Sequence, residues 1–368
     1  MKIRAAVLER FGEPLVVQDV ELAGPKAGEV LVRLHACGVC HTDMYTASGV
    51  DPSGYAPCVL GHEGAGVVEA VGDGVVSVVP GDHVVTLFSP QCGECVNCRS
   101  GKTNICVAIR EQQNQGYLPD GTARLSRDSE ELRHFMGCST FAEATVMSEI
   151  SLAKIDPEAS LEAACLFACG LSTGLGAAMY RAGVEAGSTV VVFGLGMVGL
   201  GAVAGARLMG AERIIGIDLS EERLELARRH GATDGWVADE HTVDRVLEAT
   251  DGFGADFTFE ATGNVSVMRQ AVEAARIGWG VATMTGVAGR GETLDIVPRY
   301  LITGRKVLGA SFGGVRGREQ VPQLVERYLA GDIDVDAFIS HRIRLDDVNE
   351  GFELMHHQDG IRSVIQYT

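Results

Sequence analysis

The sequence feature that most constrains the fold is a short apolar segment that runs directly into a glycine-rich turn. VVVF at residues 190–193 precedes GLGMVG, whose glycines are Gly194, Gly196 and Gly199. A G-x-G-x-x-G turn between a strand and a helix is typical of a sheet that binds a dinucleotide, because the glycines allow a tight turn, the approach of a pyrophosphate and close helix packing. The free N–H groups at the start of the following helix favour anions. The segment therefore predicts the first unit of a parallel, doubly wound sheet.

The sequence after the turn continues with alternating strands and helices. RIIGID at 213–218 is the next apolar strand, and SEERLELARRHG at 220–231 predicts a charged helix that follows the capping residue Ser220. Asp218 ends that strand about 20 residues after the glycines, where a carboxylate accepts hydrogen bonds from the adenosine ribose and repels a 2′-phosphate. The pattern therefore favours NAD over NADP. The alternative is a glycine-rich turn followed by an ordinary surface aspartate.

The residues on either side of this region favour short strands punctuated by glycine. Such strands are expected at 29–35, 64–71 and 81–87, and a closing segment at 361–368 has the same character. The tail should therefore return to the domain formed by the first part of the chain.

These patterns predict an α/β chain with two domains. An irregular β catalytic domain is expected at 1–170, a doubly wound nucleotide-binding domain at 171–310, and a return to the catalytic domain at 311–368.

Charge and composition narrow the class of partner. The chain has 49 acidic and 31 basic residues, giving a formal charge of −18, which disfavours nucleic acid and anionic membranes. No secretory signal is visible, and the uncharged segment at 190–206 contains five glycines and is better explained as strand, turn and helix than as a membrane span. We therefore expect a cytoplasmic protein that acts on a small molecule.

Ten cysteines in such a chain are more consistent with metal ligands and buried thiols than with disulfides. Four of them lie in one loop at 91–107: Cys92, Cys95, Cys98 and Cys106. Four thiolates in so compact a loop suit a tetrahedral zinc, and because they leave no open position the site would be structural. The alternatives are two disulfides or a redox C-x-x-C pair.

A second metal site is predicted from residues that are distant in sequence. Cys40 in GVCHTD, His62 in GHEGAG and Cys169 in ACGLSTG together offer two thiolates and an imidazole. Three such ligands leave a fourth position for water or substrate, as in a catalytic zinc site. Taken singly, each residue could instead be a buried thiol or a structural histidine. The remaining cysteines are interpreted as buried thiols: Cys37, Cys58, Cys138 and Cys165.

The motifs taken together resemble one enzyme family. GVCHTD, LGHEGAGVVEAVG, PQCGECVNCRSGKTNIC and FGLGMVGLG, in this order, resemble the zinc-dependent medium-chain alcohol dehydrogenases. Within them the chain is most similar to class III, the glutathione-dependent formaldehyde dehydrogenases, over nearly its whole length. The resemblance implies a GroES-like catalytic domain, a Rossmann domain, NAD, and two zinc ions per chain assembled as a homodimer or homotetramer.

The resemblance also implies roles for individual residues. Cys40, His62 and Cys169 would bind the catalytic zinc, with Asp43 orienting His62 and Glu63 behind the metal. The four cysteines of the loop at 91–107 would bind the structural zinc. Thr42 would hydrogen-bond the alcohol and start the proton relay. His41 and Arg362 would bind the pyrophosphate, Asp218 the ribose and Arg223 the adenosine.

The substrate assignment rests on three positions. Class III enzymes hold the charged ends of a thiol–formaldehyde adduct with an Arg and an Asp, which correspond here to Arg110 and Asp51, although both could be solvated loop charges. Phe88 stands where the class III pattern usually has Tyr, which favours apolar or aromatic alcohols. Three hypotheses remain open. The chain could oxidise a hydroxymethyl-thiol adduct in formaldehyde detoxification, or it could oxidise general primary, aryl or long-chain alcohols. The third hypothesis is that it is a non-catalytic relative that binds a nucleotide.

Overall fold

The computed structural model describes residues 1–50, 54–101 and 104–367. The chain forms two compact units: unit 1 comprises residues 1–169 and 316–368, and unit 2 comprises residues 170–315. Each unit is described by itself.

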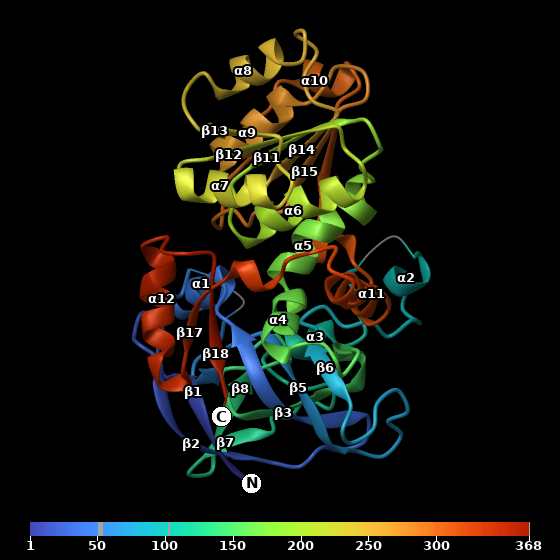
Figure 1. Ribbon diagram of the computed structural model, residues 1–368. Coiled ribbons are helices and arrows are strands. Elements are labelled where there is room, and N and C mark those ends of the chain that lie inside the picture. Colours follow the sequence, from blue (N-terminus) through green and yellow to red (C-terminus); the bar gives the residue numbers. More distant parts are fainter. Residues whose placement is uncertain (51–53, 102–103, 368) are drawn as a thin grey trace. The chain divides into compact units, whose positions relative to one another are not determined.

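Unit 2 contains a six-stranded parallel sheet in the order β13-β12-β11-β14-β15-β16 (Figure 1). In chain order the strands are β11 (Thr189–Phe193), β12 (Arg213–Asp218), β13 (Asp234–Val237), β14 (Phe257–Glu260), β15 (Val281–Met284) and β16 (Lys306–Gly309). The strand order reverses between β11 and β14, which makes the sheet doubly wound. The fold class predicted from the glycine turn is therefore confirmed.

Helices connect these strands, and their ends follow the sequence signals. They are α5 (Gly170–Gly176), α6 (Met197–Leu208), α7 (Glu221–Arg229), α8 (Thr242–Glu248), α9 (Val265–Ala274) and α10 (Pro298–Ile302). The predicted cap of α7 is present, because the Ser220 hydroxyl accepts a hydrogen bond from the Arg223 N–H at 3.4 Å. Val191, Phe193, Ile215 and Ile217 belong to an apolar core that also includes Val246 of α8 and Ala271 of α9.

Unit 1 is built from a small barrel and a larger sheet. The barrel has the order β1-β2-β7-β8-β4. Its strands are β1 (Lys2–Leu8), β2 (Val16–Leu22), β4 (Cys58–Val59), β7 (Leu125–Arg127) and β8 (Glu130–His134). Short strands of different direction enclose a core that includes Val7, Leu22 and Leu132.

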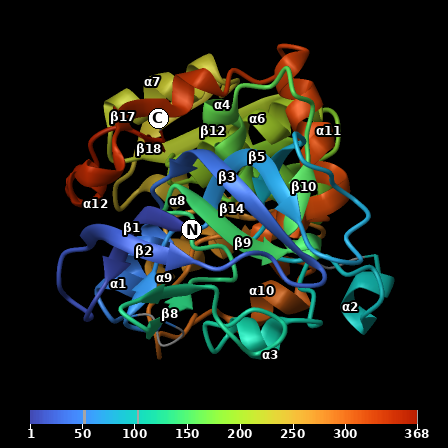
Figure 2. The same ribbon diagram turned by 90° about the horizontal axis from the view of Figure 1, so that it is seen from below.

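The larger sheet of unit 1 runs β10-β6-β5-β3-β18-β17, with β9 also paired to β3. Its strands are β3 (Glu29–Gly38), β5 (Glu63–Val71), β6 (His83–Thr86), β9 (Ala144–Ser148), β10 (Leu152–Lys154), β17 (Ile339–Ile343) and β18 (Arg362–Gln366). Figure 2 shows β9, β3 and β5 side by side, in agreement with their antiparallel pairing. Val364 of β18 pairs with Gly38 of β3, so the end of the chain lies in the same sheet as part of its beginning.

The helices of unit 1 are mostly short and lie in the connections between strands. They are α1 (His41–Ala47), α2 (Val96–Arg99), α3 (Arg110–Gln113), α4 (Leu161–Ala164), α11 (Gly317–Leu329) and α12 (Val348–His356). Within the described ranges no single helix is long and apolar enough to cross a membrane, and one bent pair, Leu161–Ala168 with Gly170–Ala182, passes only by length and composition.

Candidate functional site

A cluster of metal-binding groups in unit 1 brings together residues from three distant segments. Cys40 lies just before α1, His62 and Glu63 lie at the start of β5, and Cys169 follows the 3₁₀ turn Cys165–Ala168. One ligand atom from each of the four residues lies within 4.8 Å of the others. Two sulfurs, an imidazole nitrogen and a carboxylate oxygen are donors that zinc prefers. The structure therefore places the three predicted catalytic ligands around one point, and the donor set fits zinc.

Asp43 organises this cluster from behind. Its Oδ1 lies 3.0 Å from His62 Nδ1 and accepts the Gly61 N–H at 3.1 Å, while its Oδ2 accepts the Cys40 N–H at 3.1 Å. Asp43 and His62 are both buried. The contact leaves the other imidazole nitrogen, Nε2, for a metal.

Burial and charge act in opposite directions on the pKa of His62. Burial lowers it, but the Asp43 carboxylate and the Cys40 sulfur outweigh burial and raise the pKa well above its ordinary value. Cys40 and Cys169 share a hydrogen bond between their sulfurs. That bond lowers the pKa of Cys40 and raises that of Cys169. Zinc binds the thiolate form of cysteine, and the lowered pKa favours this form in Cys40.

Glu63 and Arg362 form a second buried layer at this cluster. Arg362 Nη2 lies 3.4 Å from Glu63 Oε1, and its Nη1 donates to the Val39 carbonyl at 2.6 Å. Neither Glu63 oxygen has a hydrogen-bond partner among the described residues. Burial raises the pKa of Glu63 to about 7, although the Arg362 charge opposes this. The predicted pyrophosphate ligand Arg362 thus contacts Glu63 directly, which local sequence patterns did not reveal.

Two aromatic rings border the His62 imidazole. The Phe88 ring lies edge-on at 5.7 Å between centroids and the Phe135 ring at 5.8 Å. Phe88 was predicted as a substrate residue, whereas Phe135 was missed. Thr42 lies close to the same point, with its Oγ1 3.8 Å from Cys40 Sγ.

The predicted substrate charges can be only partly placed. Arg110 is the first residue of α3, is exposed, and forms no ion pair with any residue that the structure describes. Asp51 lies outside the described residues.

The four cysteines of the loop at 91–107 form a separate cluster. One ligand atom from each of Cys92, Cys95, Cys98 and Cys106 lies within 4.8 Å of the others. The Cys95 N–H donates to Cys92 Sγ at 3.3 Å, and the Cys98 N–H donates to Cys95 Sγ at 3.4 Å. Burial opposes ionisation, but backbone N–H groups outweigh it and lower the pKa of Cys95 to about 6.

All cysteines, each within the described residues, are free thiols, so the disulfide alternative is wrong. The loop therefore fits a structural zinc with four sulfur ligands. The residues interpreted as buried thiols, Cys37, Cys58, Cys138 and Cys165, are indeed buried, which confirms that prediction.

The glycine turn of unit 2 has the geometry that its sequence implies. Gly194 has a φ of +86°, and a Cβ on Gly199 would lie 1.8 Å from the Gly194 carbonyl oxygen. A Cβ on Gly196, which caps α6, would meet nothing within 4 Å. The space above Gly196 is therefore open to a ligand at the start of α6, which fits a pyrophosphate.

Asp218 stands beside this turn. Its Oδ2 accepts the Leu195 N–H at 2.6 Å and its Oδ1 accepts the Ser220 N–H at 3.0 Å. Each carboxylate oxygen has a further lone pair, so the side chain can still accept from a ribose. Arg223 lies in the first turn of α7, and His41 is an exposed residue of α1 in unit 1.

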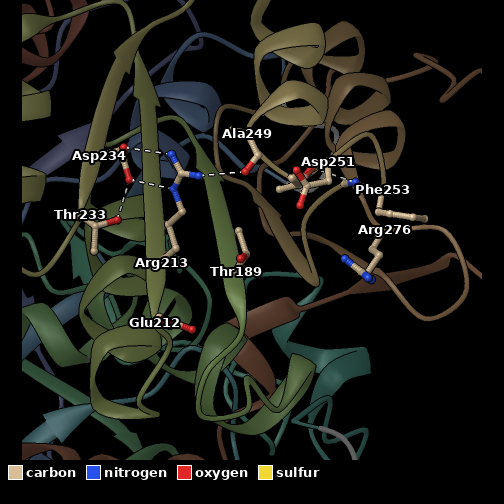
Figure 3. A pocket seen from close by; sticks show the side chains of 11 residues that line it. Thr189, Glu212, Arg213, Thr233, Asp234, Ala249, Asp251, Phe253 and Arg276 are labelled. Atoms are coloured by element: carbon tan, nitrogen blue, oxygen red, sulfur yellow. Dashed lines mark hydrogen bonds and ion pairs between the residues drawn. The ribbon is translucent and has the colours of Figure 1, made fainter.

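A pocket in unit 2 is lined by residues that were not predicted to be functional (Figure 3). Its volume is about 560 Å³, and Thr189, Arg213 and Asp234 in its wall begin β11, β12 and β13. The pocket therefore lies at the amino ends of these strands, whereas the glycine turn follows the carboxyl end of β11. Arg213 there is already bound to Asp234 and donates to the Ala249 carbonyl at 2.9 Å.

Comparisons with known proteins show the family to which the chain belongs. Residues 26–157 match the family model of the alcohol dehydrogenase GroES-like domain, and residues 197–330 match that of zinc-binding dehydrogenases. The chain is 52% identical over 369 residues to S-(hydroxymethyl)glutathione dehydrogenases of Escherichia coli O1:K1 / APEC and Shigella sonnei, with all of both chains covered.

Solved structures agree as well. An alcohol dehydrogenase zinc-binding domain protein from Burkholderia ambifaria has a TM-score of 0.95 at 33% identity, with 100% of this chain and 99% of that chain covered. A benzyl alcohol dehydrogenase from Acinetobacter calcoaceticus has a TM-score of 0.93 at 30% identity, with both chains fully covered.

Proposed function

Because the chain belongs to the zinc-dependent medium-chain alcohol dehydrogenases, and within them to class III, we propose that it oxidises S-(hydroxymethyl)glutathione or a similar thiol–formaldehyde adduct with NAD. The observation that carries this proposal is the 52% identity, over the full chain, to S-(hydroxymethyl)glutathione dehydrogenases. The purpose would be the removal of formaldehyde. The enzyme would work in the cytoplasm as a homodimer or homotetramer.

The bound groups divide the chemistry between them. Cys40, His62 and Cys169 would hold a zinc ion, which would supply a Lewis acid for the oxygen of an alcohol or an aldehyde. The turn from Gly194 to Gly199 would hold NAD, which would supply the hydride acceptor. Cys92, Cys95, Cys98 and Cys106 would hold a second zinc, which would stabilise the fold and take no part in the reaction.

The side chains of unit 1 orient the ligands and move the proton. Asp43 fixes the ring of His62 through Nδ1, and its second oxygen fixes the backbone of Cys40. Thr42 is beside Cys40, where its hydroxyl can accept the proton of the alcohol and pass it outward. Tyr45 lies in the next turn of α1, and its exposed side chain has a second hydroxyl on the same helix.

Two residues of unit 2 would bind the dinucleotide. Gly196 leaves room for the pyrophosphate at the start of α6, and Asp218 would accept hydrogen bonds from the adenosine ribose. The Asp218 carboxylate would repel a 2′-phosphate, which is why NAD rather than NADP is proposed.

Arg110 would recognise a carboxylate of the thiol adduct. It begins α3, is exposed, and has no ion-pair partner among the described residues, so its guanidinium can form two parallel hydrogen bonds to a ligand carboxylate. Asp51 would hold the amino end of the adduct.

The test measures NADH formation from formaldehyde with and without glutathione by the zinc-loaded enzyme and by Arg110→Ala. We expect turnover only when glutathione is present, and a KM for the adduct at least tenfold higher in the variant. Arg10→Ala removes a guanidinium that is 78% exposed and pairs with Glu13, so it serves as the matched control. Turnover that does not depend on the thiol, or an Arg110→Ala variant that matches Arg10→Ala, would contradict the proposal.

A second function has a specific observation in its favour. The Phe88 ring presents an apolar edge to His62, and a benzyl alcohol dehydrogenase of closely similar fold is 30% identical to this chain. If octanol or benzyl alcohol is oxidised and the adduct is not, the enzyme would be a general dehydrogenase of primary, aryl or long-chain alcohols.

A further inference from the structure

Gln113 lies in a position unusual for the end of a short polar helix. It is the last residue of α3, yet its side chain is buried. Its Nε2 donates to the Phe88 carbonyl at 2.8 Å and to the Met136 carbonyl at 2.6 Å. Both partners only accept hydrogen bonds, so the amide must turn its NH₂ group toward them and use both of its hydrogens.

The two carbonyls belong to the two segments that border His62. Phe88 follows β6 and places its own ring 5.7 Å from the imidazole. Met136 directly follows Phe135, whose ring lies 5.8 Å from the imidazole. A single amide nitrogen therefore holds the backbone beneath both aromatic rings.

The backbone at Met136 needs such a partner. Met136 has a φ of +52°, in the left-handed region that residues other than glycine rarely adopt, and Gly137 follows it with a φ of +67°. A Cβ on Gly137 would lie 3.6 Å from Gln113 Nε2, so the glycine and the amide pack directly against each other. Without the amide, the Met136 carbonyl would lose its shorter hydrogen bond and would keep the weaker one from the Cys138 thiol, at 3.5 Å.

We propose that Gln113 is a positioning residue that fixes the aromatic wall beside His62 and thereby sets which alcohols the site accepts. Of the two rings, Phe135 is buried, whereas Phe88 is partly exposed and can contact a substrate. The inference rests on the dehydrogenase activity of the family and not on the thiol adduct, so it is tested with simple alcohols.

The test compares Gln113→Met with wild type. Methionine keeps the length and volume of the side chain but cannot donate a hydrogen bond. We measure kcat/KM for benzyl alcohol and for ethanol with whichever nicotinamide cofactor wild type uses. The ratio of the two values should change at least tenfold, mainly through the KM for benzyl alcohol.

Two further variants isolate the donor. Gln113→Glu places a carboxylate against two carbonyls and should change the ratio more than methionine does. Gln115→Met is the matched control, because Gln115 is exposed and, among the described residues, its Nε2 donates only to the Glu111 carbonyl, at 3.3 Å. Its ratio should stay within twofold of wild type.

A double-mutant cycle separates positioning from general support of the fold. In a Phe88→Leu background, Gln113→Met should have almost no further effect on the ratio, because the ring that it positions is gone. Zinc content and thermal melting are measured for each variant, and Gln113→Asn, which keeps the donor on a shorter side chain, replaces Gln113→Met if that variant does not fold. An unchanged ratio, an equal loss for both alcohols, or additive effects in the cycle would each overturn the inference.

Discussion

The Asp43 carboxylate lies 3.0 Å from His62 Nδ1, and the same side chain accepts the backbone N–H groups of Gly61 and Cys40. One buried residue therefore sets the orientation of an imidazole ligand and the backbone position of a thiolate ligand. Removing a group that orients a metal ligand in this way typically lowers the metal affinity or the activity by about 10- to 100-fold.

Asp43→Asn should weaken the catalytic zinc site without unfolding the protein. The amide keeps the shape of the carboxylate but loses its charge and one of its acceptor oxygens, so the zinc affinity should fall about 10- to 100-fold. Competition with a chelator, followed by metal analysis, measures this. Asp73→Asn, at an exposed position, is the control, and equal affinities in the two variants would contradict the prediction.

Cys169→Ala should remove one zinc and all turnover while the fold persists. The variant deletes one of the two sulfurs of the catalytic cluster and leaves the loop with Cys92, Cys95, Cys98 and Cys106 intact. Native mass spectrometry should find one zinc per chain instead of two. A variant that keeps both ions and full activity would show that the ligand set is wrong.

Asp218→Asn should relax the choice between the two dinucleotides. Asparagine retains one oxygen to accept a backbone N–H, but it carries no charge to repel a 2′-phosphate. The ratio of kcat/KM for NAD to that for NADP should fall at least tenfold. Asp244→Asn, at an exposed position of α8, should keep the wild-type ratio, and the assignment fails if the two variants behave alike.

His134 should make the protein less stable in acid. It is buried and accepts the Arg124 N–H at 3.0 Å, and burial, together with the Arg124 charge, lowers its pKa to about 3. Its pKa in the unfolded chain is about 6.5, so the unfolded state binds the extra proton between these values. The stabilising contribution is complete above pH ~6.5 and is lost, at up to about 1.4 kcal/mol per pH unit, as the pH falls toward 3.

His134→Gln tests this, because glutamine can accept the same hydrogen bond and does not titrate. Denaturant unfolding at a series of pH values from about 4 to 7 should give a flatter curve of unfolding free energy for the variant than for wild type. His357→Gln, at a side chain that is 73% exposed, is the control and should leave the slope unchanged. Parallel curves for His134→Gln and wild type would contradict the prediction.

The fold of unit 2 could be predicted because its signals are local. The strand at 213–218 has the predicted bounds, and Asp218 ends it beside the glycine turn. In unit 1 the predicted strand at 29–35 continues to Gly38, and the one at 81–87 is shorter, covering His83–Thr86. These ends depend on pairing with distant strands, which no local pattern encodes.

Sequence patterns named the candidate ligands and the supporting residue Asp43, but they did not name Gln113. Cysteine and histidine in characteristic motifs point to a metal wherever they lie in the chain, so Cys40, His62 and Cys169 could be grouped. Gln113 carries no such signal, because a glutamine in the polar stretch REQQNQ is expected to be exposed to solvent. Only the folded chain shows that it reaches two carbonyls.

The insertion of β18 between β3 and β17 has a consequence for synthesis of the protein. A nascent chain that has reached Val315 already holds the whole of unit 2, but it lacks the two strands that complete the larger sheet of unit 1. Until Arg362 emerges, Glu63 lacks the guanidinium that contacts it in the folded chain. The ion pair beside the metal cluster can therefore form only after the whole of unit 2 has been translated.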